Sequence, residues 1–130
     1  MSIESSNADS LNQLTNTLLL NNKTNKIPLQ TTDGYIFLRS QDISYIKSED
    51  IYANVYNGSE KYFVIESLKS LEEILPEKDF FRCHRSYLVN INKVFKLNKK
   101  SNYMLILENG TQVPVSRSNK EKVVQKLLEK

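Results

Sequence analysis

The sequence has few of the residues from which catalytic and metal-binding sites are built. Among its 130 residues it has one cysteine, Cys83, and one histidine, His84, so no internal disulfide and no zinc site of Cys and His ligands can form. Its three glycines are too scattered for a G-x-G-x-x-G or P-loop motif. No loop carries the clustered carboxylates that bind Ca²⁺ or Mg²⁺. We therefore expect no cofactor, no metal and no enzymatic activity.

Long hydrophobic runs are also absent. The longest, Tyr103 to Leu107, has five residues, whereas a membrane-spanning helix needs about 20. The first residues are polar, which predicts no secretory signal, and a single cysteine is typical of a reducing compartment. With 39% apolar and 25% charged residues, the chain has the balance of one globular domain. These features predict a soluble, cytoplasmic protein with no membrane contact.

Charge is distributed unevenly along the chain. Residues 41–79 hold four bases and nine acids (4 − 9 = −5), while residues 80–130 hold eleven bases and three acids (11 − 3 = +8). A half-chain this basic predicts an anionic partner, with nucleic acid first and an anionic membrane surface second. The alternative is a solvated face whose charge only aids solubility.

The first 26 residues differ in composition from the rest. They are rich in Asn, Ser and Thr, yet Leu11, Leu14 and Leu18 follow a helical spacing. We therefore predict a polar N-terminal linker over residues 1–26 with a short amphipathic helix, followed by a folded domain over residues 27–130. Because so short a helix is marginal alone in water, its leucines are expected to dock on the domain, on a partner copy or on something upstream.

The remainder predicts a mainly β domain. Each glycine follows Asn or Asp, and such pairs favour the tight turns of β-hairpins. The pairs are Asp33-Gly34, Asn57-Gly58 and Asn109-Gly110. The strands expected to pair around them are residues 27–31 with 35–38, 52–56 with 61–65, and 103–107 with 111–115. Two further strands are expected over residues 43–47 and 89–97, the second interrupted near Asn92.

Two helices accompany these strands. Leucines from Leu68 to Leu75 lie on one helical face, and Ser67 is placed to cap that helix. The capping box Ser118-x-x-Glu121 and the apolar stripe after it predict a final helix from about Asn119.

Chemically versatile side chains are densest in Phe80-Phe-Arg-Cys-His-Arg-Ser-Tyr-Leu-Val-Asn90. Strand alternation would send Arg82 and His84 to one face and Cys83 and Arg85 to the other. The planar fork of arginine fits phosphate oxygens or the edge of guanine, and His and Ser add single hydrogen bonds. A second basic cluster, Ser116-Arg-Ser-Asn-Lys120, opens the last helix, where the helix dipole also attracts phosphate.

Simpler structural roles are open for several of these side chains. His84 is equally well explained as a residue that holds Ser86 or a backbone carbonyl in place. Cys83 fits a small buried hydrophobe better than a nucleophile, because no activating second histidine or nearby aspartate is present. The aromatic residues of this segment fit core positions; they are Phe80, Phe81 and Tyr87.

Several motifs follow one another in a recognisable order. They are Asp42-Ile-Ser-Tyr-Ile-Lys47, Tyr52, the helical segment from Ser67 to Pro76, Phe81-Arg-Cys-His-Arg-Ser-Tyr-Leu-Val-Asn90, Leu107-Glu-Asn-Gly110 and Val113-Pro-Val-Ser-Arg117. This order resembles the LytTR family of bacterial DNA-binding domains, over about Ile27 to Lys130. The resemblance implies an elongated stack of small antiparallel sheets with a short mid-chain helix and a C-terminal helix. It also implies sequence-specific binding of double-stranded DNA by a transcriptional regulator, through loops inserted into successive major grooves.

The resemblance assigns DNA contacts residue by residue. Arg85 and Arg117 match base-contacting positions, and the loop before Tyr52 matches a third contact region. That loop reads Lys47-Ser-Glu-Asp-Ile-Tyr52 where the family often has Glu-Ala-x-Gly-Asn-Tyr, so the residue that reaches DNA is left open. Lys93 and Lys120 are phosphate-contact candidates on charge and position only. The expected DNA-binding residues are Tyr52, Arg82, His84, Arg85, Ser86, Lys93, Arg117 and Lys120.

The resemblance also implies partners. Family members typically bind paired direct repeats, which allows a homodimer on DNA, and many are the output half of two-component response regulators. Only 26 residues precede the module here, too few for a receiver domain. We expect either a free-standing regulator or the output part of a larger protein served by a receiver domain or sensor kinase. The alternative function is a protein-interaction or regulatory β-module without nucleic-acid binding. Binding of single strands by a small barrel would need aromatics stacked on one sheet face, whereas the tyrosines are scattered.

Overall fold

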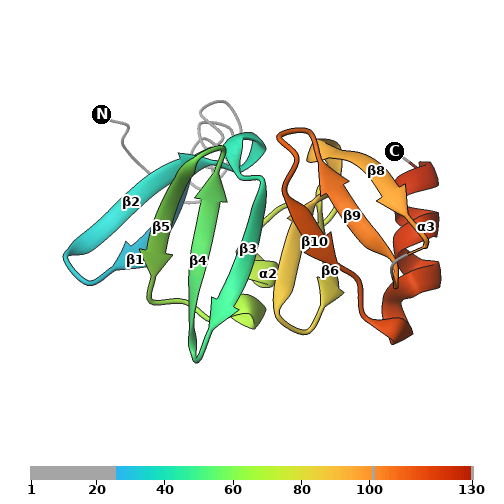
Figure 1. The fold of residues 1–130 in the computed structure, drawn as a ribbon. Coiled ribbons are helices and arrows are strands. Elements are labelled where there is room, and N and C mark those ends of the chain that lie inside the picture. Colours follow the sequence, from blue (N-terminus) through green and yellow to red (C-terminus); the bar gives the residue numbers. More distant parts are fainter. Residues whose placement is uncertain (1–25, 101, 130) are drawn as a thin grey trace, which may run out of the picture.

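The computed structural model describes residues 26–100 and 102–129. In these residues the chain is mainly β, with ten strands in three antiparallel sheets, two α-helices and three short 3-10 turns (Figure 1). The sheets follow one another across Figure 1, with the C-terminal helix at the far end. The predicted N-terminal linker and its amphipathic helix lie outside the described residues.

The largest sheet has five strands in the order β5-β4-β3-β7-β6. Their bounds are β3 (Tyr45–Glu49), β4 (Tyr52–Asn57), β5 (Glu60–Val64), β6 (Phe80–His84) and β7 (Tyr87–Asn90). The helix α2 (Leu68–Ile74) connects β5 to β6, so two hairpins far apart in sequence meet where β3 pairs with β7.

The two smaller sheets flank this one. The first is the hairpin of β1 (Lys26–Thr31) and β2 (Gly34–Arg39). The second has the order β10-β9-β8, with β8 (Val94–Asn98), β9 (Met104–Leu107) and β10 (Gln112–Pro114). The helix α3 (Lys120–Glu129) closes the chain beside this second sheet (Figure 1).

The central strand β7 contributes to two separate hydrophobic clusters. Leu88 belongs to the cluster formed with β1, β3, β4, β5 and α2, whereas its neighbour Val89 belongs to the cluster with β9, β10 and α3. Successive residues of a strand point to opposite faces, so β7 is buried on both sides. The middle sheet therefore joins the two halves of the domain into one packed stack.

The predicted hairpins are confirmed, with differences at their turns. Gly58 opens the two-residue turn between β4 and β5 with φ +61°, as a tight hairpin requires. The sequence predicted Asp33-Gly34 as the turn between β1 and β2. The turn consists of Thr32 and Asp33, because Gly34 is already paired with Thr31 at the start of β2. The expected strand over residues 43–47 runs from Tyr45 to Glu49, because a 3-10 turn at Ser40–Asp42 delays its start.

The two helices are confirmed, but the second begins differently from the prediction. Ser67 caps α2, and its hydroxyl accepts from the Ser70 backbone N–H at 3.0 Å. Before α3, residues Arg117–Asn119 form a 3-10 turn that contains Ser118. Ser118 is therefore inside a turn and not at the helix N-cap, so the predicted capping box is wrong. None of the helices in the described part of the chain is long and apolar enough to span a membrane.

Candidate nucleic-acid interface

Three loops lie side by side along one edge of the molecule, the lower edge in Figure 1. They are the β3–β4 turn (Asp50–Ile51), the β6–β7 turn (Arg85–Ser86) and the 3-10 turn Arg117–Asn119. Backbone hydrogen bonds link the supports of these loops: the Ser48 N–H donates to the Ser86 carbonyl at 2.9 Å, and the Ser116 N–H to the Cys83 carbonyl at 2.9 Å. We call this surface the three-loop edge.

A bulge in β6 decides how the central loop is presented. Phe81 pairs with Val89 and His84 with Tyr87, so one extra residue lies on the β6 side of this stretch. The strand then ends at His84, and Arg85 occupies the turn. The prediction that Arg85 shares a strand face with Cys83 is therefore wrong, because alternation is broken before Arg85 is reached.

Arg85 and Arg117 are the two cations carried by the three loops that define this edge. Both side chains are exposed. Within residues 26–100 and 102–129, neither guanidinium has a hydrogen-bond or ion-pair partner. Their full set of N–H donors is thus open to an external acceptor, and a guanidinium fork suits a phosphate or a guanine edge.

His84 supports the central loop from within. Its Nδ1 accepts from the Ser86 backbone N–H at 3.1 Å, and its ring lies edge-on to Tyr87 with centroids 5.6 Å apart. Burial, and then the charges of Arg85 and Arg82, lower the pKa of His84 below its ordinary value, which favours the neutral ring that can accept at Nδ1. The interpretation of His84 as a residue that holds Ser86 is confirmed, and direct DNA contact by either residue stays a prediction.

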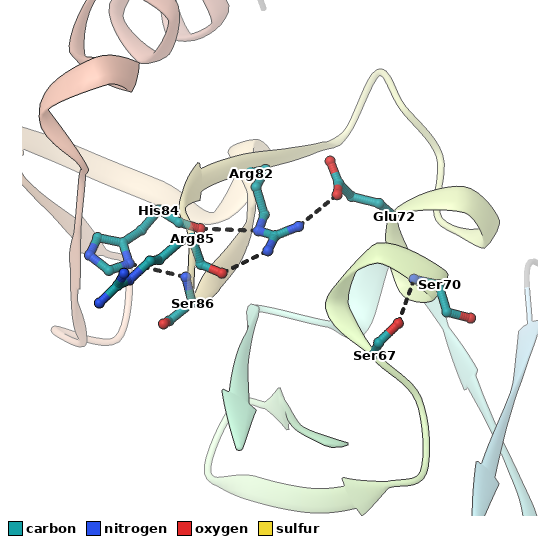
Figure 2. Close-up of polar contacts among 7 residues, drawn as sticks. All are labelled: Ser67, Ser70, Glu72, Arg82, His84, Arg85 and Ser86. Atoms are coloured by element: carbon teal, nitrogen blue, oxygen red, sulfur yellow. Dashed lines mark hydrogen bonds and ion pairs between the residues drawn. The ribbon is translucent and has the colours of Figure 1, made fainter. Parts of the chain in front are cut away.

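Arg82 is occupied by contacts inside the domain. Figure 2 shows its guanidinium between Glu72 of α2 and the backbone carbonyls of His84 and Arg85, while the Arg85 side chain extends the other way. The sequence does not reveal Glu72 as a partner, because ten residues and a loop separate it from Arg82.

Cys83 of β6 is fully buried, and its side chain faces β10. Burial raises the pKa of its thiol to about 12, and Sγ lies 3.5 Å from the Pro114 carbonyl, to which it donates. A thiol in this state is protonated and shielded, so the interpretation as a small buried hydrophobe is confirmed.

The β3–β4 turn is the loop for which the sequence did not indicate which residue reaches DNA. Tyr52 is half-buried and packs edge-on against Phe63, with centroids 5.4 Å apart. Asp50 adopts φ +56°, a conformation that Asp tolerates better than most residues, and Ile51 beyond it is 71% exposed. Ile51 is therefore the tip of this loop, a position that sequence reasoning did not single out.

The two candidate lysines lie in different places. Lys120 begins α3 next to the 3-10 turn, with Nζ 4.7 Å from the centroid of the Tyr103 ring. Lys93 follows β7 at the end opposite the Arg85 turn, in a hollow with Asp42, Gly58 and Glu108. The structure thus brings Lys120 near the three-loop edge and separates Lys93 from it.

Ligands for a metal ion do not gather in the part of the chain that the structure describes. No group of three or more His, Cys, Asp or Glu side chains there is arranged to hold a cation. The chemistry available at the three-loop edge is hydrogen bonding and charge.

Comparison with known proteins identifies the domain. Residues 33–128 match the family model described as LytTr DNA-binding domain. The chain is 34% identical over 105 residues to the sensory transduction protein LytT of Bacillus subtilis (strain 168), covering 79% of this chain and 43% of LytT. It is 31% identical to the transcriptional regulatory protein LytR of Staphylococcus aureus (strain N315), covering 71% of this chain and 38% of LytR. The chain thus spans less than half the length of these relatives.

A solved structure agrees with the sequence comparisons. A LytTr DNA-binding domain from Bacillus cereus superimposes with a TM-score of 0.69 at 31% identity, covering 79% of this chain and 96% of that domain. The fold, the matched family model and the named relatives all indicate the same family. The chain belongs to the LytTR family of DNA-binding domains of transcriptional regulators, and not to a family of enzymes.

Proposed function

We propose that this domain recognises a specific sequence of double-stranded DNA through the three-loop edge. The observation that carries the proposal is the presence of two exposed arginines, Arg85 and Arg117, without internal partners on adjacent loops of that edge. Loops that project from one edge of a rigid stack can enter the major groove, where each base pair presents a distinct pattern of donors and acceptors.

The side chains of the edge divide into two roles. Arg85 and Arg117 read base edges, since bidentate arginine–guanine pairs are the commonest specific contact. Lys120 contacts phosphate at the start of α3 and sets the register of the domain on the duplex. His84 and Ser86 form the backbone platform beneath Arg85, and the Ser86 hydroxyl adds a single hydrogen bond to the DNA.

The β3–β4 turn supplies the third contact. Ile51 at its tip offers an apolar surface that fits the methyl group of thymine, and Tyr52 supports the turn from β4. Asp50 carries a charge that repels phosphate but accepts from the amino group of cytosine. This loop therefore adds base selectivity with little attraction to the DNA backbone.

The setting of the domain is inferred from its relatives. Because LytT is named a sensory transduction protein and LytR a transcriptional regulatory protein, we infer that this domain is the output part of a cytoplasmic signalling pathway with an upstream receiver domain or sensor kinase. Two copies on paired direct repeats would double the contact surface, and a homodimer on DNA follows from that arrangement. The alternative of a β-module without nucleic-acid binding loses its support because the family is one of DNA-binding domains.

Selection from a randomised duplex library at moderate salt tests the proposal. Enrichment of a short motif, in two copies about one helical turn apart, is the expected result and supplies the site. Retention of DNA without enrichment would leave only electrostatic attraction, and a folded protein that retains no duplex at low salt would overturn the proposal.

A further inference from the structure

We infer that Arg82 is a positioning residue: its guanidinium fixes the backbone of the Arg85–Ser86 turn and connects that turn to α2 through Glu72. The inference rests on the proposed function, because its consequence is control of how Arg85 meets a base. It assigns Arg82 a role through Arg85 in place of direct contact with DNA.

Three nitrogen atoms of Arg82 have three separate acceptors (Figure 2). Nε donates to the His84 carbonyl at 3.1 Å and Nη2 to the Arg85 carbonyl at 2.7 Å. Nη1 donates to Oε1 of Glu72 at 2.8 Å. A planar fork can satisfy two successive carbonyls and a carboxylate at once, whereas the point charge of a lysine cannot.

The bulge in β6 makes this arrangement possible. The extra residue near Arg82 and Cys83 interrupts the regular alternation of side chains. Bulges re-aim side chains near functional sites. Here the Arg82 side chain lies along the end of its own strand and the turn that follows. It contacts the backbone carbonyls of the residues two and three positions further along the chain, His84 and Arg85.

The same turn is held at two further points. The Ser86 N–H donates to Nδ1 of His84, and the Ser86 carbonyl accepts from the Ser48 N–H of β3. The backbone of the turn is thus restrained from β6, β3 and α2, while the Arg85 side chain extends without an internal partner. A restrained backbone lowers the ordering cost when Arg85 binds, and this lower cost appears as affinity for the correct base.

The negative charge of Glu72 distinguishes a positioning role from a simple electrostatic effect, because the two predict opposite changes in DNA affinity when Glu72 is removed. An acid near a DNA-binding edge repels phosphate, so its removal alone should strengthen binding to any duplex. If Glu72 instead holds Arg82 in place, its removal weakens binding to the selected sequence. Glu72 and Arg82 are 42% and 31% exposed, so the pair lies at the surface and its substitution is compatible with folding.

The experiment compares R82K, R82A and E72A with two matched controls. E73A removes an exposed acid from the same helix, and R39A removes an exposed arginine from the far end of β2. For each, affinity is measured for the duplex selected by the wild-type domain and for a scrambled duplex, across a series of salt concentrations. Slow alkylation of the buried Cys83 thiol confirms that β6 is folded in each variant.

We expect R82K and R82A to lose about tenfold or more in affinity for the selected duplex, with relaxed preference at the base read by Arg85. E72A should weaken the same binding, while E73A leaves it unchanged or slightly stronger. R39A measures how much affinity is lost when one positive charge is removed far from the three-loop edge. Once this loss is allowed for, R82A should bind the scrambled duplex as tightly as the wild type does. Its slope of log K against log salt should also equal that of the wild type.

The opposite pattern would overturn the inference. If Arg82 contacts phosphate, R82K keeps most of the affinity, because the positive charge remains. R82A then binds both duplexes less tightly by the same factor, and its slope of log K against log salt differs from that of the wild type by about 0.9. E72A would then bind as well as E73A. In that case the wild type still selects a motif, so the proposed function survives while the positioning role fails.

A measurement without DNA keeps the inference testable if the proposed function fails. Backbone amide relaxation by NMR should show that R82K and E72A increase the mobility of Arg85 and Ser86 relative to the wild type. The Gly58–Ser59 turn at the opposite edge serves as the internal reference. Unchanged order at Arg85 and Ser86 in both variants would refute the positioning role whatever the DNA result.

Discussion

The backbone N–H of Ser86 donates to Nδ1 of His84 over 3.1 Å, and this bond requires a ring without a proton on Nδ1. Burial and the charges of Arg85 and Arg82 lower the pKa of His84 in the folded state, so its folded pKa lies below the unfolded one. Protonation therefore favours the unfolded chain. The contribution of His84 to stability is complete above about pH 6.5 and is lost as the pH falls through the folded-state pKa.

We predict that the imidazole resonances of His84 titrate with a midpoint below 6.5 in the folded domain. Because His84 is the only histidine of the sequence, NMR follows its titration without ambiguity. The Ser86 amide should shift with the same midpoint, since its acceptor is lost on protonation. A midpoint at or above 6.5, or a Ser86 amide that ignores the titration, would contradict this account.

Arg85 and Arg117 are expected to read different bases of one site. Either R85A or R117A should lower affinity for the selected duplex by about 1–3 kcal/mol, and each should relax preference at a different position. Repeating the library selection with each variant measures both effects, with R39A as the control for loss of one positive charge. An unchanged motif in both variants would remove these arginines from the readout.

Local signals in the sequence predicted most of the secondary structure. Asn57-Gly58 encodes a turn because glycine adopts φ +61° without strain, and Ser67 marks the start of α2 because its hydroxyl reaches the Ser70 N–H. The failures occurred where neighbours in space decide. Ser118 fits a capping box by its spacing from Glu121. In the structure, however, the Ser116 N–H donates to the Cys83 carbonyl of β6, and the chain then forms a 3-10 turn before α3 begins.

The candidate site was predictable in its residues but not in its geometry. The motif around His84 indicated which arginines to consider, whereas the bulge in β6 separated their roles by placing Arg85 in the turn and Arg82 against Glu72. No spacing rule connects a helical glutamate with a strand arginine ten residues later. The position of Lys93 depends on the direction of β7 in the sheet, which local patterns do not specify.

The two candidate lysines should differ in their effect on salt dependence. K120A is expected to weaken binding to all duplexes alike and to reduce the slope of log K against log salt by about 0.9, because Lys120 lies beside the three-loop edge. K93A should leave the slope unchanged, because Lys93 lies at the opposite edge beside Asp42 and Glu108. Titrations at several salt concentrations measure both slopes, and an equal reduction in the two variants would mean that DNA reaches the far edge as well.

Asn90 ends the motif Phe81-Arg-Cys-His-Arg-Ser-Tyr-Leu-Val-Asn90, yet its contacts are internal. The residue is 1% exposed; its Nδ2 donates to the Ile43 carbonyl at 2.9 Å, and its Oδ1 accepts from the Asn92 N–H at 2.9 Å. N90A would leave both backbone groups without these partners, so we predict a loss of about 1–3 kcal/mol in the free energy of unfolding, measured by denaturant titration. N98A, which removes an exposed acceptor of the Lys100 N–H, should cost about 0.5 kcal/mol or less.

Because Asn90 lies at the end of β7 opposite the Arg85 turn, the lost stability of N90A should leave DNA selectivity intact. At a temperature where N90A is fully folded, its selected motif is expected to equal that of the wild type. An altered motif in folded N90A would show that the strand transmits changes from one edge to the other, and the division between stabilising and reading residues would then be wrong. An N90A that is as stable as N98A would show instead that water or neighbouring groups replace the buried amide, and that the two hydrogen bonds of Asn90 add little to stability.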